Sequence, residues 1–197
     1  MACQLLAAQN GIPHAGGKLR LEVIALAAAN DNVERQNYLA LYDAIGTALY
    51  TSSRIGGLFV PFARGVQPGF TGISVDRAGR VFVAFGTGAH SSFLVVLDPG
   101  VRPVRTFGTL PGDGGEPRFF TDTPSSGALD VDGDGINELV SVVNDYDPNY
   151  AQGTSTALYY KYEVGDFQAM GCTTLTANID LTKPPRSAPA SKACKMS

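Results

Sequence analysis

Three segments of the 197-residue sequence share one pattern, and this recurrence limits the possible folds more than any other feature. Residues 37–51, 92–106 and 156–170 each contain an apolar run, a turn with Gly or Pro-Gly, and a second run. Their first residues lie 55 and 64 positions apart. Two strand-like runs joined by a short turn with glycine are typical of a β-hairpin. The sequence therefore predicts three hairpins at a nearly regular spacing.

A second pair of strands is expected before each of these hairpins. Residues 72–85 read as strand, tight loop and strand, and residues 127–143 repeat this plan 55 positions later. The first copy is weaker, with strands expected at 5–8 and 19–26 and a loop over 9–18. Each unit thus offers four short strands in up-and-down order. Such a unit cannot bury both faces alone, so neighbouring units are expected to stack on it.

The predicted fold class is all-β, with β-propeller-like blades of four antiparallel strands and about three blades in this chain. The repeat domain is expected over 1–178, with units of about 1–57, 58–112 and 113–178. Residues 179–197 are expected to form an extended Pro-rich tail. Propellers typically close with about four to eight blades. Three blades therefore form an incomplete ring, a ring completed by another chain, or an open array.

Composition agrees with short strands joined by tight turns. The chain has 23 glycines and 12 prolines, and only 17% of its residues are charged, which favours this architecture over a helical bundle. A helix is the alternative prediction for the Ala-rich residues 23–29. The connectors 54–70 and 110–126 are rich in Gly and Pro and are expected to be loops between blades.

Residues 130–138 form an acidic, glycine-containing loop with the spacing of a calcium site. Its first, third, fifth and ninth positions carry carboxylates. These belong to Asp130, Asp132, Asp134 and Glu138. Ile136 is expected to offer its backbone carbonyl, while Gly133 and Gly135 permit a tight path. Hard oxygen ligands in this number suit Ca²⁺ better than Mg²⁺, and four close carboxylates would repel one another without a cation.

The loop differs from an EF-hand, which needs a bidentate Glu at its twelfth position. That position is Ser141, within an apparent strand, and residues 127–129 before the loop show no helical pattern. The alternative interpretation is an acidic hairpin turn that binds no metal.

The segment Asp-Val-Asp-Gly-Asp-Gly-Ile-Asn-Glu-Leu-Val, residues 130–140, resembles the loop of FG-GAP repeats, as in the propeller of integrin α subunits and related bacterial and fungal repeat proteins. The similarity is close over 127–143 and loose over about 19–176. It implies a blade whose first two strands hold Ca²⁺. The corresponding loop 76–80 keeps one acid and two cations, so no metal is expected there, and residues 9–11 have no carboxylate.

No constellation of catalytic residues stands out in the sequence. The two histidines, His14 and His90, lie in expected loops, and no nucleophile elbow, zinc-protease motif or phosphate loop occurs. Asp145 and Asp147 lie in a loop with amides and tyrosines, which is typical either of a binding surface or of a solvated connector. We therefore predict no catalytic site, and an enzyme remains a minor alternative.

Charge and cysteine usage limit the partners and the compartment. The net charge of −3 and the pI near 5.3 give no reason to expect nucleic acid. No apolar run approaches the length of a membrane span, so membrane insertion is not expected. Three cysteines, Cys3, Cys172 and Cys194, allow one disulfide or none. The resemblance implies an extracellular or cell-surface location, whereas the lack of a secretory signal pattern at the start points the other way.

Three functions are carried forward from the sequence. The first is a non-enzymatic recognition, adhesion or assembly module with a structural Ca²⁺ in residues 130–138 and a protein or glycan as its ligand. The second is a structural subunit that assembles with other copies into filaments or rings. The third is a carbohydrate-active enzyme on a propeller scaffold, with Asp145 and Asp147 near its mouth.

Overall fold

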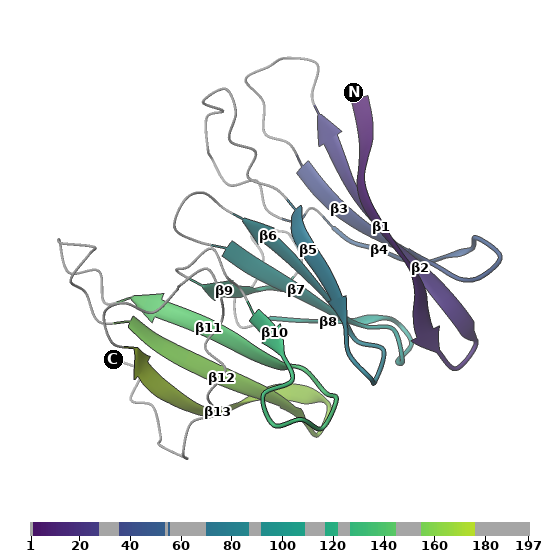
Figure 1. The fold of residues 1–197 in the computed structure, drawn as a ribbon. Coiled ribbons are helices and arrows are strands. Elements are labelled where there is room, and N and C mark those ends of the chain that lie inside the picture. Colours follow the sequence, from purple (N-terminus) through teal and green to yellow (C-terminus); the bar gives the residue numbers. More distant parts are fainter. Residues whose placement is uncertain are drawn as a thin grey trace.

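The chain folds into three antiparallel β-sheets that stack face to face (Figure 1). The computed structural model describes residues 2–27, 36–53, 55, 70–86, 92–108, 117–121, 127–144 and 155–175. These residues contain thirteen strands and no helix, which confirms the all-β prediction. Residues 23–27, where a helix was the alternative, belong to a strand.

The first sheet has the order β1-β2-β3-β4. Its strands are β1 (Ala2–His14), β2 (Gly17–Ala27), β3 (Gln36–Tyr42) and β4 (Ala48–Thr51). The β3–β4 hairpin confirms the first of the three predicted hairpins.

The prediction of a loop over residues 9–18 is wrong. β1 and β2 pair without a loop until His14 faces Gly17. A register shift between Asn10 and Ile12 explains the difference, because Gly11 adopts a positive φ of 77° there. The bulge allows the strand to continue through residues whose sequence is typical of a turn.

The middle sheet follows the path β5-β6-β7-β8, and β9 also pairs with β7. Its strands are β5 (Phe70–Val75), β6 (Val81–Gly86), β7 (Ser92–Asp98), β8 (Arg105–Phe107) and β9 (Phe119–Thr121). The β5–β6 and β7–β8 pairs confirm two predicted pairings. The expectation that residues 110–126 contain only loop is corrected by β9.

β8 and β9 form one interrupted edge strand along β7. Residues 96–98 of β7 pair with β8, and residues 92–94 pair with β9. The chain leaves this edge at Gly108 and returns beside it, since a Cβ on Gly108 would lie 1.9 Å from the backbone nitrogen of Arg118. Only glycine fits at this close backbone approach.

The third sheet has the order β10-β11-β12-β13. Its strands are β10 (Gly127–Leu129), β11 (Glu138–Asn144), β12 (Ser155–Glu163) and β13 (Asp166–Leu175). Both predicted strand pairs of this unit are confirmed. The whole of the expected tail, residues 179–197, lies outside the described residues, and the division of the chain into units stays a prediction.

The middle sheet contributes to two hydrophobic cores, one on each face. Val81, Val83 and Phe85 of β6 pack in one cluster with residues of the first sheet. Phe82, the alternate residue, packs in a second cluster with Leu139 of the third sheet. Because side chains alternate across a strand, β6 and β7 must be apolar at nearly every position.

The core between the middle and third sheets is rich in aromatic rings. Phe167 packs edge to face against four of them, with ring centres 5.4 to 6.3 Å apart. These rings belong to Phe82, Phe107, Phe119 and Tyr162. The contacts join β6, β8 and β9 of the middle sheet to the β12–β13 hairpin, so the two sheets share one packed interior.

Two other expectations have partial outcomes. Cys172 takes part in a disulfide and Cys3 is a free, exposed thiol, while Cys194 lies outside the described residues. In the described part of the chain, none of the three sheets closes on itself. Among the same residues, no helix has the length and hydropathy of a membrane span.

Candidate metal centre

The acidic loop joins β10 to β11, as the sequence predicts. Gly133 and Gly135 adopt positive φ angles of 80° and 82°, which turn the backbone back on itself. The Asp130 carboxylate fixes this turn by accepting hydrogen bonds from the backbone nitrogens of Gly133 at 2.7 Å and Gly135 at 2.9 Å. Asp130 therefore shapes the loop from its first position.

The next two acids each use one oxygen to hold the loop backbone. Asp132 Oδ1 accepts from the backbone nitrogen of Asp134 at 3.2 Å, and Asp134 Oδ1 accepts from that of Ile136 at 2.8 Å. The second oxygen of each carboxylate is thereby turned toward the same side chain, Lys161. Ile136 lies in the loop as predicted, and its role as a carbonyl ligand stays a prediction.

Glu138, the first residue of β11, is the buried member of the site. Its side chain has 0% exposure. Oε2 accepts a hydrogen bond from the backbone nitrogen of Val131 at 2.8 Å, while Oε1 has no hydrogen-bond donor. Burial raises the pKa of Glu138, the charges of Asp132 and Asp134 add to the rise, and the Val131 amide and Lys161 oppose it.

Three of the predicted ligands converge within the described residues. Asp130, Asp132 and Glu138 each offer a carboxylate oxygen, and these oxygens lie within 4.8 Å of one another. Asp130 and Asp132 are exposed to solvent, whereas Glu138 is buried. This acidic triad has the donor type and spacing to hold a metal ion, and its oxygen ligands suit hard cations such as Ca²⁺ and Mg²⁺.

Lys161, on β12, is the residue that sequence reasoning missed. Its Nζ donates to Asp132 Oδ2 and, at 3.0 Å, to Asp134 Oδ2, and it lies 3.9 Å from Glu138 Oε1. These hydrogen bonds raise the pKa of Lys161, and the same contact is the main cause of the lowered pKa of Asp134.

Strand register explains how Lys161 reaches the loop. β11 and β12 pair from Leu139 opposite Tyr160, so one step further along the ladder brings Lys161 beside Glu138. The isolated lysine between Tyr160 and Tyr162 was a usable sequence signal, but only together with this register.

The corresponding loop of the middle sheet holds a side-chain cation of its own. Asp76 Oδ1 accepts from the backbone nitrogen of Arg80 at 2.9 Å, and Asp76 Oδ2 contacts Nε at 2.8 Å and Nη2 at 2.7 Å of the same arginine. Both side chains are buried. The arginine thus neutralises the one acid of this loop.

The first hairpin loops of the three sheets lie in a row. The backbone nitrogen of Arg77 donates to the carbonyl oxygen of Gly135 at 2.9 Å, which joins the middle loop to the acidic loop. A Cβ on Gly79 would lie 2.6 Å from the carbonyl oxygen of Pro13, so the middle loop also abuts the β1–β2 hairpin. The acidic loop is therefore held by its neighbour as well as by its own strands.

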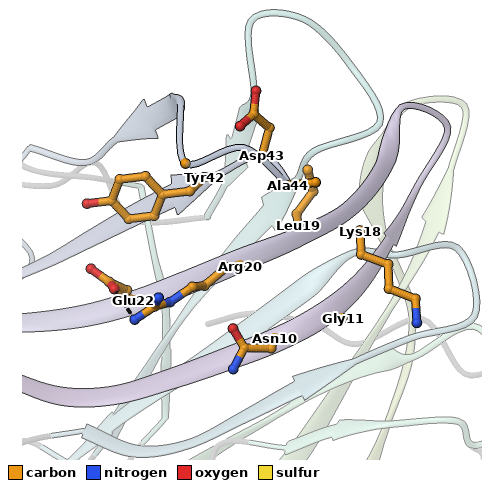
Figure 2. Close-up of a pocket in the computed structure, with 10 residues that line it drawn as sticks. Asn10, Gly11, Lys18, Leu19, Arg20, Glu22, Tyr42, Asp43 and Ala44 are labelled. Atoms are coloured by element: carbon orange, nitrogen blue, oxygen red, sulfur yellow. Dashed lines mark ion pairs between the residues drawn. The ribbon is translucent and has the colours of Figure 1, made fainter.

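A pocket of about 560 Å³ lies on the first sheet, between the β1–β2 hairpin and the β3–β4 loop (Figure 2). Arg20 and Glu22 of β2 form an ion pair of 2.5 Å at its wall, beside Tyr42 of β3. Lys18 and Asn10 also line it. Charged groups of both signs and an aromatic ring are typical of a surface for polar ligands rather than for a metal ion.

Of the residues considered for catalysis, His14 is the one that lies within the described part of the chain. His14 ends β1 and lies next to Gly16 in the hairpin turn. His90, Asp145 and Asp147 lie outside the described residues.

Comparison of the chain with models of known families, with curated proteins and with solved structures found no match. The similarity to FG-GAP repeats therefore rests on the loop motif and the strand pattern of the chain itself.

Proposed function

We propose that this protein is a calcium-binding, non-enzymatic module in which residues 130–138 hold one structural Ca²⁺. Asp130, Asp132 and Glu138 would bind the ion with their converging carboxylates. Asp134 and the carbonyl of Ile136 complete the proposed ligand set. The ion would tie the loop to β11 and balance the repulsion among the acids.

The observation that carries this proposal is the Glu138 oxygen that receives no hydrogen bond. Oε1 is buried and lacks a hydrogen-bond donor. A buried acceptor without a partner costs free energy, and the cost is larger when the group is charged. One carboxylate oxygen of Glu138 lies within 4.8 Å of carboxylate oxygens of Asp130 and Asp132, so repulsion among the three groups would add to that cost. A divalent cation bound to all three groups relieves both.

Charge balance supports a divalent ion at the same place. The loop has four carboxylates, and among the described residues Lys161 is the one ammonium group bound to them. Three negative charges therefore remain uncompensated within this set. Ca²⁺ fits such a flexible, all-oxygen loop better than Mg²⁺, which demands a strict octahedron and keeps several waters.

The blade interpretation and the recognition role belong to the same proposal. Three four-stranded antiparallel paths that stack face to face support blades of a propeller or of an open blade array. Modules of this kind act through their surfaces, so we propose a protein or glycan ligand at the cell surface or outside the cell. The polar pocket beside Tyr42 supports a binding role. Assembly with further copies stays the alternative, and no described residue favours the enzyme.

Thermal unfolding in EDTA and in rising calcium tests the proposal on the wild type and on Asp132→Ala. A bound ion stabilises the folded state by about 2.7 kcal/mol when calcium is a hundredfold above Kd. We expect the wild-type Tm to rise with calcium and the Asp132→Ala Tm to stay constant. Glu163→Ala is the matched control, because Glu163 is an exposed acid at the end of β12. A calcium-independent wild-type Tm, with no calcium found by direct metal analysis, would contradict the proposal.

A further inference from the structure

The ammonium group of Lys161 and a metal ion would use the same oxygens. Lys161 Nζ binds Asp132 Oδ2 and Asp134 Oδ2, and it approaches Glu138 Oε1 to 3.9 Å. Asp132 and Glu138 also belong to the acidic triad that is spaced for an ion. Two cations on one set of carboxylates repel each other strongly at contact distances.

We propose that Lys161 is a built-in competitor of calcium, so that the ion binds only by displacing this side chain from the acidic loop. The inference rests on the proposed calcium site and specifies how that site is regulated. Without calcium, the lysine holds Asp132 and Asp134 together. With calcium, the lysine is released, and the calcium concentration at which this exchange occurs is set by the strength of the lysine contacts.

The location of Lys161 permits the exchange without any change of the fold. Its backbone is held in β12, where Lys161 pairs with Gln168 of β13 between the pairs Tyr160–Ala169 and Tyr162–Phe167. The side chain is 23% exposed and ends at the surface side of the loop. A flexible four-carbon stem can turn toward solvent while the strand stays in register.

The buried partner of the exchange is Glu138. Lys161 satisfies Asp132 and Asp134 by hydrogen bonds, but at 3.9 Å it leaves Glu138 Oε1 without one. The lysine therefore occupies the exposed part of the site and gives no hydrogen bond to the buried oxygen of Glu138. This favours the metal ion over the lysine, because the ion can bind the Glu138 oxygen to which the lysine donates no hydrogen bond.

The middle sheet offers a comparison within the same chain. Arg80 binds the single acid of its loop, Asp76, with both side chains buried. Arg80 is further held by its guanidinium lying 4.0 Å from the ring centre of Tyr162. The middle loop has one carboxylate and a fixed cation. The acidic loop has four carboxylates, and its cation, Lys161, is partly exposed and can be released.

Calcium titration calorimetry on the wild type and on Lys161→Met tests the competition. Charge-assisted hydrogen bonds of this kind are strong enough that their loss should tighten calcium binding by about tenfold or more. Lys18→Met is the matched control, because it removes the same charge from an exposed position on the β1–β2 hairpin. We expect Lys18→Met to bind calcium as the wild type does.

Each result separates the two proposals. Equal or weaker calcium binding by Lys161→Met than by the wild type overturns the competition and leaves the calcium site standing. Absence of calcium binding in both proteins overturns the calcium site itself.

A second measurement uses only the wild type and stands even if Lys161→Met fails to fold. Amine acetylation followed by peptide mapping reports how accessible each lysine is, with Lys18 as the internal reference. Saturating calcium should increase the labelling of Lys161 and leave that of Lys18 unchanged. Unchanged labelling of Lys161, in protein shown by calorimetry to have bound calcium, overturns the proposal.

Discussion

In two hairpin loops of this chain, acids bind a side-chain cation, and the two cations lie at different depths. Asp76 and Arg80 form a buried ion pair inside the middle loop. Asp132 and Asp134 instead bind a partly exposed lysine from another hairpin. Burial makes the first pair costly to break, since a single charge left in the interior loses both its partner and its hydration.

Asp76→Asn should destabilise the protein by about 3–5 kcal/mol, because the guanidinium of Arg80 is then buried without a counter-charge. The double variant Asp76→Asn/Arg80→Met removes both charges and should recover most of that loss. Urea unfolding of the two variants and the wild type measures the difference. A loss in the double variant as large as in Asp76→Asn would contradict the explanation by a buried, unpaired charge.

The positions of the acids were predictable from the sequence, and the cation beside them was not. Asp130, Asp132, Asp134 and Glu138 lie within nine residues, so local spacing alone brings them together. Lys161 is 27 residues beyond Asp134 and reaches it through the β11–β12 pairing. Register of this kind depends on which faces are buried, and a loop motif does not contain that information.

At the scale of elements, the tight turn between β12 and β13 contains an unfavourable residue. Glu163 pairs with Asp166, so only Val164 and Gly165 form the turn. Both have positive φ angles, 51° and 86°, as a type I′ turn requires. A β-branched residue rarely adopts this conformation, and the side chain of Val164 is fully exposed, so no packing offsets the strain.

Val164→Asn should therefore stabilise the protein by ~1 kcal/mol, because Asn tolerates a positive φ at this position of the turn. Val101→Asn is the control, since Val101 is another exposed loop valine whose φ is not positive. Chemical denaturation of both variants gives the comparison. A gain of equal size in Val101→Asn would mean that removal of an exposed apolar side chain, and not relief of the turn, stabilises the protein.

Most hairpins were predictable because the residues that specify them are close together in the sequence. The two wrong predictions concern segments whose structure depends on distant parts of the chain. The β1–β2 hairpin is longer than expected because the bulge at Gly11 continues a strand that looks interrupted. The three residues of β9 lie in a stretch rich in Gly and Pro, and they become a strand only because β7 offers an unpaired edge beyond β8. Tertiary context decides both cases.

At the scale of the molecule, the described sheets form a stack in which the middle sheet joins the other two. One buried cluster combines the first and middle sheets, and another combines the middle and third sheets. Alternate residues of β6 and β7 enter the two clusters, so loosening one face of the middle sheet disturbs the other. Stacked repeats with such large shared interfaces unfold together when the interfaces dominate their stability.

Calcium bound at the edge of the third sheet should consequently protect the first sheet as well. Amides of β2 and β3 that exchange only through global unfolding should slow with calcium by the same factor as amides of β11 and β12. That factor is about a hundredfold when calcium is a hundredfold above Kd, because binding lowers the unfolded fraction in that proportion. Hydrogen exchange followed by mass spectrometry, with and without calcium, measures both sheets in one sample. In Asp132→Ala neither sheet should gain protection. Protection confined to β10–β13 would show instead that the third sheet opens independently of the stack.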